Sequence, residues 1–198
     1  MRKIGVLGNG VHRTFEYIVR AIAAGTIENC EVVVVAANHP NVPIFTSAAE
    51  FGIPYLYLDG ADPAEIDAQA LTAFRDHGVD FVILLGYGKK IGPALLDAYP
   101  YGILNIHSAP LPQFGGKGMV QPVSQAHVLA SGLRYSGPTI HLVDAEYDHG
   151  QILAHWPVPI RPGDTPESLN MRCNLAGMPL YVQAIRDFVH RFDHPDEY

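Results

Sequence analysis

The feature that most constrains the fold is a pair of short apolar runs without alternating polar residues. Residues 32–37 read Val-Val-Val-Val-Ala-Ala, and residues 81–85 read Phe-Val-Ile-Leu-Leu. A strand with one face in water alternates apolar and polar residues, whereas a strand covered on both faces is apolar along its length. Both runs are therefore expected to be central strands of a mostly parallel sheet.

The segments around these runs alternate between strand and helix patterns. Asp62, followed by Pro63 and Glu65, has the residue types that begin a helix. Further strands are expected over residues 3–7, 54–58, 102–106, 139–143 and 151–157, the last two pairing antiparallel. Helices are expected over residues 15–25, 44–51, 63–77, 93–99, 123–131 and 166–188. This order predicts an α/β, Rossmann-like fold, with a mixed, mostly parallel sheet and helices on both faces, in which residues 1–198 form a single domain.

Charge and apolar patterning argue against several classes of protein. The chain has 13 Lys and Arg against 20 Asp and Glu, a net charge of −7, and no run of basic residues longer than two. Nucleic acid and anionic membranes are therefore not expected as partners, and a small molecule is. No apolar run approaches the roughly 18 residues that span a bilayer. The two cysteines, Cys30 and Cys173, lie far apart in the sequence, which is typical of a reducing compartment, so a cytoplasmic location is expected.

Ten histidines raise the question of a metal site. His190 and His194 are the only histidine pair four residues apart, and no third ligand lies near them in the sequence. No metal is expected.

A glycine loop follows the first expected strand. Gly8-Asn9-Gly10 is either a tight turn between strand and helix or a loop whose N–H groups bind an anion or a substrate. Arg13 favours the second interpretation slightly, because a guanidinium could meet a phosphate. The same residue stands where a dinucleotide fingerprint needs its third glycine, so that fingerprint is absent.

Asn105 and His107 lie two residues apart at the end of an expected central strand. Their side chains should therefore point to the same face, at the edge of the sheet where α/β proteins bind ligands. A carboxamide beside an imidazole suits the stabilisation of an oxyanion together with the transfer of a proton. The alternative is a histidine with a structural role only.

The segment 141–150 places three carboxylates and two histidines between two expected strands. It is either an exposed acidic turn or part of a reactive site. Asp144 could be a turn-forming residue, and chemistry alone does not choose between Asp144 and Asp148 as a functional carboxylate.

Four blocks of residues together resemble the folate-dependent formyltransferases, and within them the glycinamide ribonucleotide (GAR) transformylases. The blocks are Leu104–Pro112, Ser136-Gly137, His141–Val143 and Tyr147–Leu153, and the loop Phe114–Met119 resembles a variant found in part of the family. The resemblance implies the formyltransferase fold and an enzyme of purine biosynthesis that transfers a formyl group from 10-formyltetrahydrofolate to an amine. It assigns the catalytic roles to Asn105, His107 and Asp148, with Asp148 expected to raise the pKa of His107.

The same resemblance implies two binding regions and only small-molecule partners, the folate and the amine acceptor. The folate is expected to contact Tyr87, Gly88, Lys89, Lys90, Ile91, Leu104, Val143, Asp144 and Tyr147. The acceptor is expected to contact Gly8, Asn9, Gly10, Val11, His12 and Arg13. A monomer and a homodimer are both compatible with the sequence.

The departures from the family pattern concern the acceptor. Val11 and His12 replace a Ser-Asn pair, and Gly177 stands near the position of a glutamate that holds the acceptor in the family. Val123 and Gln125 stand where histidines occur, and Ser108 replaces a proline. GAR is the first acceptor expected, another amine such as an amino sugar is the alternative, and a non-catalytic folate-binding protein is a third reading.

Overall fold

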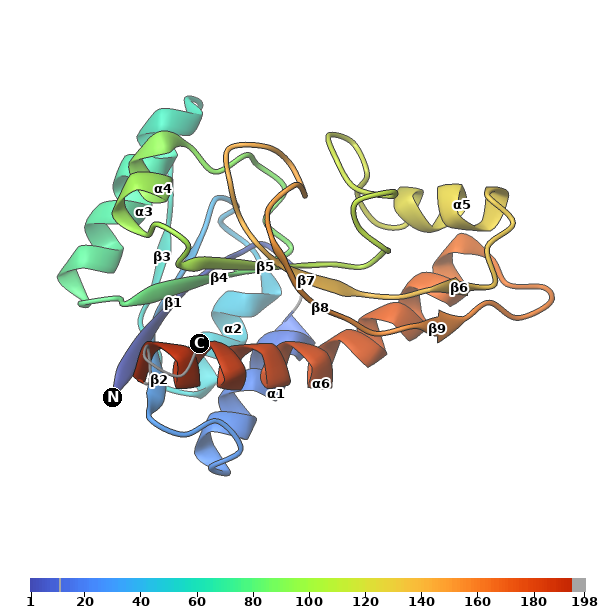
Figure 1. Cartoon of the computed structure of the whole chain (residues 1–198). Helices are drawn as coiled ribbons and strands as arrows, with labels where there is room; N and C mark the ends of the chain where they lie inside the picture. The colour runs from blue at the N-terminus through green and yellow to red at the C-terminus, as the bar shows by residue number, and fades with distance from the viewer. Residues whose placement is uncertain (11, 194–198) are drawn as a thin grey trace.

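The computed structural model describes residues 1–10 and 12–193, in which strands and helices alternate along the chain (Figure 1). The strands are β1 (Arg2–Gly8), β2 (Cys30–Ala37), β3 (Tyr55–Tyr57), β4 (Phe81–Leu85), β5 (Ile103–His107), β6 (Tyr135–Ser136), β7 (Thr139–Leu142), β8 (Ile152–His155) and β9 (Val158–Pro159). The helices are α1 (His12–Ala23), α2 (Pro43–Glu50), α3 (Pro63–Asp76), α4 (Pro93–Ala98), α5 (Val123–Ala130) and α6 (Pro166–Asp193).

Seven of these strands form one sheet in the order β3-β2-β1-β4-β5-β7-β8. The pairs from β3 to β5 are parallel, whereas β7 is antiparallel to both β5 and β8. The two unalternating runs are β2 and β4, and every residue of β4 is buried. The predicted mixed, mostly parallel sheet is confirmed.

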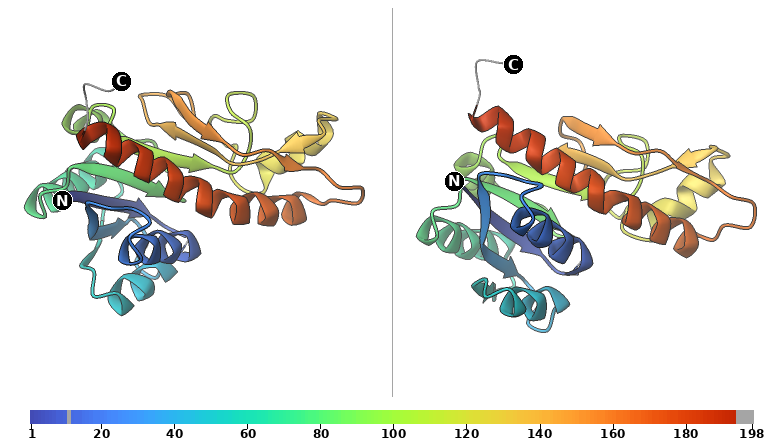
Figure 2. Two further views of the ribbon diagram at one scale, coloured as in Figure 1. Left: turned by 60° about the horizontal axis from the view of Figure 1, so that its bottom comes forward. Right: turned by 90° about the horizontal axis from the view of Figure 1, so that it is seen from below.

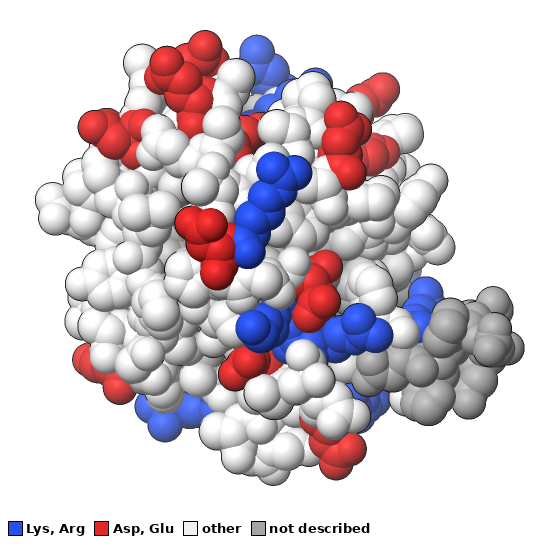
Figure 3. Space-filling view, turned by 90° about the vertical axis from the view of Figure 1, so that its left-hand side faces the viewer, with Lys and Arg blue, Asp and Glu red and all other residues white. Residues whose placement is uncertain are grey.

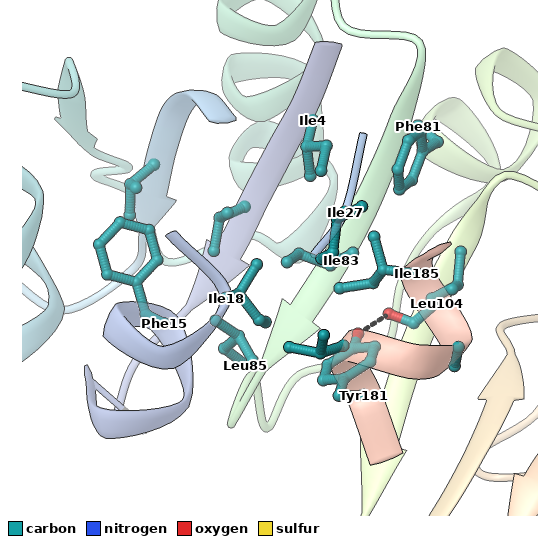
Figure 4. Packing of buried hydrophobic residues seen from close by; sticks show 14 of the residues in the cluster. Ile4, Phe15, Ile18, Ile27, Phe81, Ile83, Leu85, Leu104, Tyr181 and Ile185 are labelled. Carbon is teal, nitrogen blue, oxygen red and sulfur yellow. Dashed lines mark hydrogen bonds between the residues drawn. The ribbon is translucent and has the colours of Figure 1, made fainter. Parts of the chain in front are cut away.

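Helices cover both faces of this sheet, as predicted. On one face α1, α2 and α6 pack around Phe15, Ile44 and Tyr181, and on the other α3 and α4 pack around Phe74 and Leu95. Figure 2 shows α6 running along the length of the sheet. Figure 4 shows the first of these cores, in which the Tyr181 hydroxyl donates to the carbonyl of Leu104 at 2.8 Å.

The C-terminal part of the chain differs from the prediction in three details. The strand expected over residues 151–157 is β8, which stops at His155 because Pro157, two residues on, has no N–H to donate to a sheet. Helix α6 continues past residue 188 to Asp193 and contains Pro179. The small pair β6·β9 was not expected from the sequence.

The carboxyl ends of β1, β4 and β5 meet at one edge of the sheet. There the Asn9 N–H donates to the carbonyl of Leu85 at 3.2 Å, and a Cβ at Gly8 would collide with that carbonyl. The turn after β1 therefore requires glycine at position 8, so the tight-turn interpretation holds for that residue. Loops from β1, β4 and β5 converge on this edge, which is the position of ligand sites in open α/β sheets.

Charged side chains of both signs are interspersed on the face of the molecule shown in Figure 3. Of the helices described, none is long and apolar enough to cross a membrane. The cytoplasmic location stays a prediction.

Candidate active site

The last residues of β5 place an imidazole and a carboxamide at this edge. Because side chains alternate along a strand, Asn105 and His107 project to the same face, as predicted. His107 is buried, and its Nε2 lies 2.7 Å from the carbonyl oxygen of Phe114. A carbonyl only accepts hydrogen bonds, so Nε2 carries a proton and Nδ1 faces the remaining partner.

That partner is Asp148. His107 Nδ1 lies 3.6 Å from Asp148 Oδ2, and the same carboxylate oxygen accepts the N–H of Gly116 at 3.0 Å. Asp148 has a left-handed backbone conformation, with φ of 52°, that turns the chain towards the loop after β5. A Cβ at Gly115 would collide with Leu111 and Asp148, so this loop packs tightly against the carboxylate.

The structure distinguishes the roles of Asp144 and Asp148, the two carboxylates between which the sequence alone does not choose. Asp144 is partly exposed and accepts the N–H of Glu146 at 2.8 Å, and its other oxygen lies 2.8 Å from His149 Nδ1. It is therefore the turn-forming residue of the loop, whereas Asp148 is the carboxylate at His107.

His141 is a further member of the cluster that was not predicted. It lies opposite Asn105 in the β5·β7 pairing, its Nδ1 is 2.8 Å from the carbonyl of Leu142, and its Nε2 is 3.0 Å from Asn105 Nδ2. Nδ1 therefore carries the proton, and Nε2 accepts one hydrogen of the Asn105 amide. His141 Nε2 also lies 3.6 Å from Asp148 Oδ1, so all four side chains form one cluster.

Burial has the largest effect on the pKa of His107. Burial lowers the pKa of His107, although the Asp148 charge and the Phe114 carbonyl act in the opposite direction. The expected effect of Asp148, which raises the pKa of His107, is confirmed in direction, but the desolvation of a nearly enclosed imidazolium outweighs this one carboxylate and makes the net shift downward. Burial also tends to raise the pKa of Asp148, but its contacts with His141, His107 and the Gly116 N–H outweigh burial and lower it. At neutral pH this geometry pairs an ionised Asp148 with a neutral His107.

Several of the residues expected to contact folate lie on the α3 and α4 side of the sheet, whereas Leu104 belongs to the core on the face of α1, α2 and α6. Tyr87 and Val143 pack against the same core cluster, and Tyr147 is close enough to Tyr87 to affect its pKa. Lys89 is half-buried, and Gly88 and Lys90 are exposed. Ile91 and Leu104 are core residues with buried side chains. These two could therefore meet a ligand only through their backbone.

The expected acceptor residues are only partly brought together. A hollow of about 500 Å³ lies between the start of α1 and the first half of α6, and its lining includes Gly10, His12 and Arg13. Asn9 is not part of it, because its side chain forms two hydrogen bonds with Asn38, at 2.7 and 3.2 Å, that join the ends of β1 and β2. Val11 lies outside the described residues.

Three amides line this hollow that sequence reasoning missed. Gln121 Oε1 accepts from Asn170 Nδ2 at 3.1 Å and from Asn174 Nδ2 at 3.0 Å. The spacing of four residues, which places both asparagines on one helix face, was the available signal. Gln121 reaches them only through the folding of the loop after β5.

The positions that depart from the family pattern have structural explanations. A Cβ at Gly177 would lie 2.7 Å from Ile106 Cδ1, so this position faces the core, and a side chain here would require Ile106 to shift. Gln125 is fully buried, donates to the carbonyl of Ser108 at 2.6 Å and accepts from Ser136 at 2.7 Å. Gln125 therefore ties the loop after His107 to β6.

Among the described residues, no group of three or more His, Cys, Asp or Glu side chains is arranged to hold a metal ion. His194, half of the pair considered above, lies outside them.

Comparisons with known proteins match nearly the whole chain. Residues 2–185 match the family described as formyl transferase. The chain is 40% identical over 192 residues to the chloroplastic phosphoribosylglycinamide formyltransferase of Arabidopsis thaliana, covering 93% of this chain and 64% of that protein. The corresponding protein of Vigna unguiculata is 36% identical over 187 residues, with 93% and 60% covered. The chain thus spans less than two thirds of the length of these relatives.

Among solved structures, the glycinamide ribonucleotide transformylase 1 of Symbiobacterium toebii is similar throughout. It superimposes with a TM-score of 0.89 at 32% identity, covering 96% of this chain and 88% of that one.

Proposed function

The chain belongs to the formyl transferase family, and we propose that it transfers a formyl group from 10-formyltetrahydrofolate to the amine of GAR in purine biosynthesis. The observation that carries this proposal is the cluster at the carboxyl end of β5, in which Asn105, His107 and Asp148 come from two separate segments. An amide donor, a neutral imidazole and an ionised carboxylate are the groups that acyl transfer to an amine requires.

Asn105 stabilises the charge that develops during the reaction. Attack of the neutral amine on the formyl carbon makes a tetrahedral centre whose oxygen becomes negative. The Asn105 amide nitrogen carries two hydrogens, and the one not held by His141 Nε2 can be donated to that oxygen. The hydrogen bond to His141 holds the amide in the orientation that this requires.

His107 and Asp148 move the proton. His107 Nδ1 takes the proton released by the attacking amine, and Asp148, 3.6 Å away, stabilises the imidazolium that forms. The same proton then passes to the folate nitrogen as the bond between that nitrogen and the formyl carbon breaks. The reaction is thus balanced without a metal or an oxidant.

The two loops beside this cluster support a folate as the formyl donor. Tyr87 and Tyr147 lie on separate loops, and Tyr147 is close enough to Tyr87 to raise its pKa. Two aromatic rings at this position suit a flat heteroaromatic group such as a pterin. We assign the folate to the segments 87–91 and 143–147.

The hollow between α1 and α6 supports an acceptor with an anionic group and hydroxyls. Arg13 and the N–H groups at the start of α1 suit a phosphate, and the amides of Gln121, Asn170 and Asn174 suit the hydroxyls of a ribose. Both groups are present in GAR, which is the acceptor we propose.

A second acceptor class is favoured by one observation. Gly177 faces the core, so no carboxylate from that position holds the acceptor, and an amine other than GAR, such as an amino sugar, would not need it.

The test is a formyl-transfer assay with 10-formyltetrahydrofolate, in which tetrahydrofolate release is followed with GAR and, in parallel, with amino sugars and small amines. We expect saturable turnover with GAR. If the protein turns over another amine but not GAR, its acceptor belongs to the second class. If it binds the folate but turns over no amine, the proposed chemistry is contradicted.

A further inference from the structure

Asp67 is a buried carboxylate that the proposed chemistry does not use. It lies in the first half of α3, 2% exposed, on a helix whose other buried residues are apolar. Its Oδ2 accepts the backbone N–H of Gly92 at 2.5 Å, and the ion pairs found within residues 1–10 and 12–193 do not include it. Burial raises the pKa of Asp67, and the Gly92 N–H opposes that rise.

The partner of Asp67 is the last residue of the loop that carries the proposed folate contacts. This loop leaves β4 after Leu85, contains residues 87–91 and ends at Gly92, where α4 begins with Pro93. Gly92 offers no side chain to cap α4, and within residues 1–10 and 12–193 the side-chain oxygen bonded at this helix start is that of Asp67, from α3. A Cβ at Gly92 would collide with the Asp67 carboxylate, which would have to move away from the Gly92 N–H.

Both ends of the loop are thereby fixed to different layers of the fold. At its start the carbonyl of Leu85 accepts the Asn9 N–H, and at its end Asp67 holds Gly92. Between them the Ile91 side chain is buried in the core, whereas Tyr87 is only half-buried. Burial raises the pKa of Tyr87, and the charge of Asp67 raises it further, which places the carboxylate close to the ring as well.

A buried carboxylate is an unfavourable choice if capping a short helix is its only task. A serine or asparagine caps a helix without the desolvation of a charge. A charged acceptor, however, holds a backbone N–H more strongly than a neutral one. The geometry is therefore that of a clamp on the position of this loop.

We propose that Asp67 is a positioning residue for the formyl donor, which holds the loop 86–92 through the Gly92 N–H so that its backbone meets the pterin. This inference rests on the proposed function, because the loop has this role only if a folate binds there. Asp67 lies behind the loop and takes no part in the chemistry at His107.

The test compares Asp67→Ala and Asp67→Asn with the wild-type protein, with KM for 10-formyltetrahydrofolate, kcat and the folate Kd by calorimetry as readouts. For Asp67→Ala we expect KM and Kd to rise roughly tenfold or more, with kcat at saturating donor within about threefold of wild type. Asp67→Asn keeps an oxygen that can accept the Gly92 N–H but loses the charge that strengthens this bond, so it should restore only part of the affinity. A uniform loss of kcat with an unchanged KM would overturn the proposal.

Asp62→Ala is the matched control for stability. Asp62 caps α3 by accepting the Ala64 N–H at 2.9 Å, so its loss weakens the same helix without reaching the loop. Its folate KM should stay at the wild-type value, and an increase equal to that of Asp67→Ala would show that only helix stability matters. If Asp67→Ala does not fold, Gly92→Ala replaces it, because the added methyl displaces the same contact, and an unchanged KM there overturns the proposal.

The two proposals fail in different ways. A wild-type protein that neither turns over nor binds 10-formyltetrahydrofolate contradicts the proposed function. A wild-type protein that does both, with Asp67→Ala and Gly92→Ala unchanged in KM, contradicts only the role of Asp67.

Discussion

Replacing Asp148 by asparagine removes one negative charge from the cluster and little else. The asparagine oxygen can still accept the Gly116 N–H, and asparagine tolerates the left-handed backbone, with φ of 52°, better than alanine does. The variant should therefore fold, with a Tm within a few degrees of wild type.

The loss of this charge should lower kcat. Two unit charges 3.6 Å apart, the distance from His107 Nδ1 to Asp148 Oδ2, interact by about 4 to 5 kcal/mol at an effective dielectric constant near 20. The Asp148 side chain is 14% exposed, so solvent screens part of this energy. With 1.4 kcal/mol for each factor of ten, we expect kcat to fall about 10²- to 10³-fold because the imidazolium loses its counter-charge.

The pH profile of kcat shows the direction in which Asp148 shifts the pKa of His107. Burial already lowers the pKa of His107, and Asp148 opposes that effect. Without the carboxylate the pKa falls further, so the acid limb of the kcat profile should move to lower pH. Protonation of the acceptor amine affects both proteins alike and cancels in the comparison.

The assay is kcat at saturating donor and acceptor from pH 5 to 9, with Asp187→Asn as the matched control. Asp187 lies on the exposed side of α6 and pairs with Arg186, so this control makes the same charge change away from the cluster. A kcat within threefold of wild type, or an acid limb that does not move, would show that Asp148 does not stabilise the imidazolium.

The remaining predictions concern the orientation of Asn105 and the acceptor. His141→Ala frees the Asn105 amide, so kcat should fall about tenfold or more with little change in either KM; an unchanged kcat would show that the 3.0 Å contact does not orient the amide. Arg13→Ala should raise the KM for GAR about tenfold or more and leave the folate KM unchanged, with Arg20→Ala on the same helix as control. A GAR KM unchanged by Arg13→Ala would remove Arg13 from the acceptor site.

The parts of the fold that follow local patterns were predictable from the sequence. The unalternating runs gave β2 and β4, and the residue types at Asp62 and Pro63 gave the start of α3, where Asp62 accepts the Ala64 N–H. Asn105 and His107 were placed on one face by the two-residue period of a strand. These features depend on residues that are close together in the sequence, so they can be predicted without the structure.

The features that were missed depend on contacts between distant segments. His141 faces Asn105 only through the register of β5 and β7, which no local pattern fixes. Asn9 is expected at the acceptor because the sequence of the glycine loop does not show that β1 and β2 are adjacent. This adjacency brings Asn9 to Asn38. In the sequence, Asp67 is one of several polar residues of α3. Its burial becomes visible only in the structure, where α4 packs against α3.

The protonation of His107 was missed for a related reason. Asp148 and its effect on the imidazole were anticipated, but the burial of His107 comes from the loop after β5 folding over it, with the Phe114 carbonyl at 2.7 Å. Desolvation of this kind depends on tertiary structure, and it decides the direction of the shift.

In the proposed mechanism this chain transfers a formyl group through His107. The most direct measurement is single-turnover formyl transfer from 10-formyltetrahydrofolate to GAR by the wild-type protein and His107→Ala, with folate binding measured on both. We expect the rate to fall at least 10²-fold in the variant, while the folate Kd stays within about threefold. Equal rates in the two proteins would contradict it.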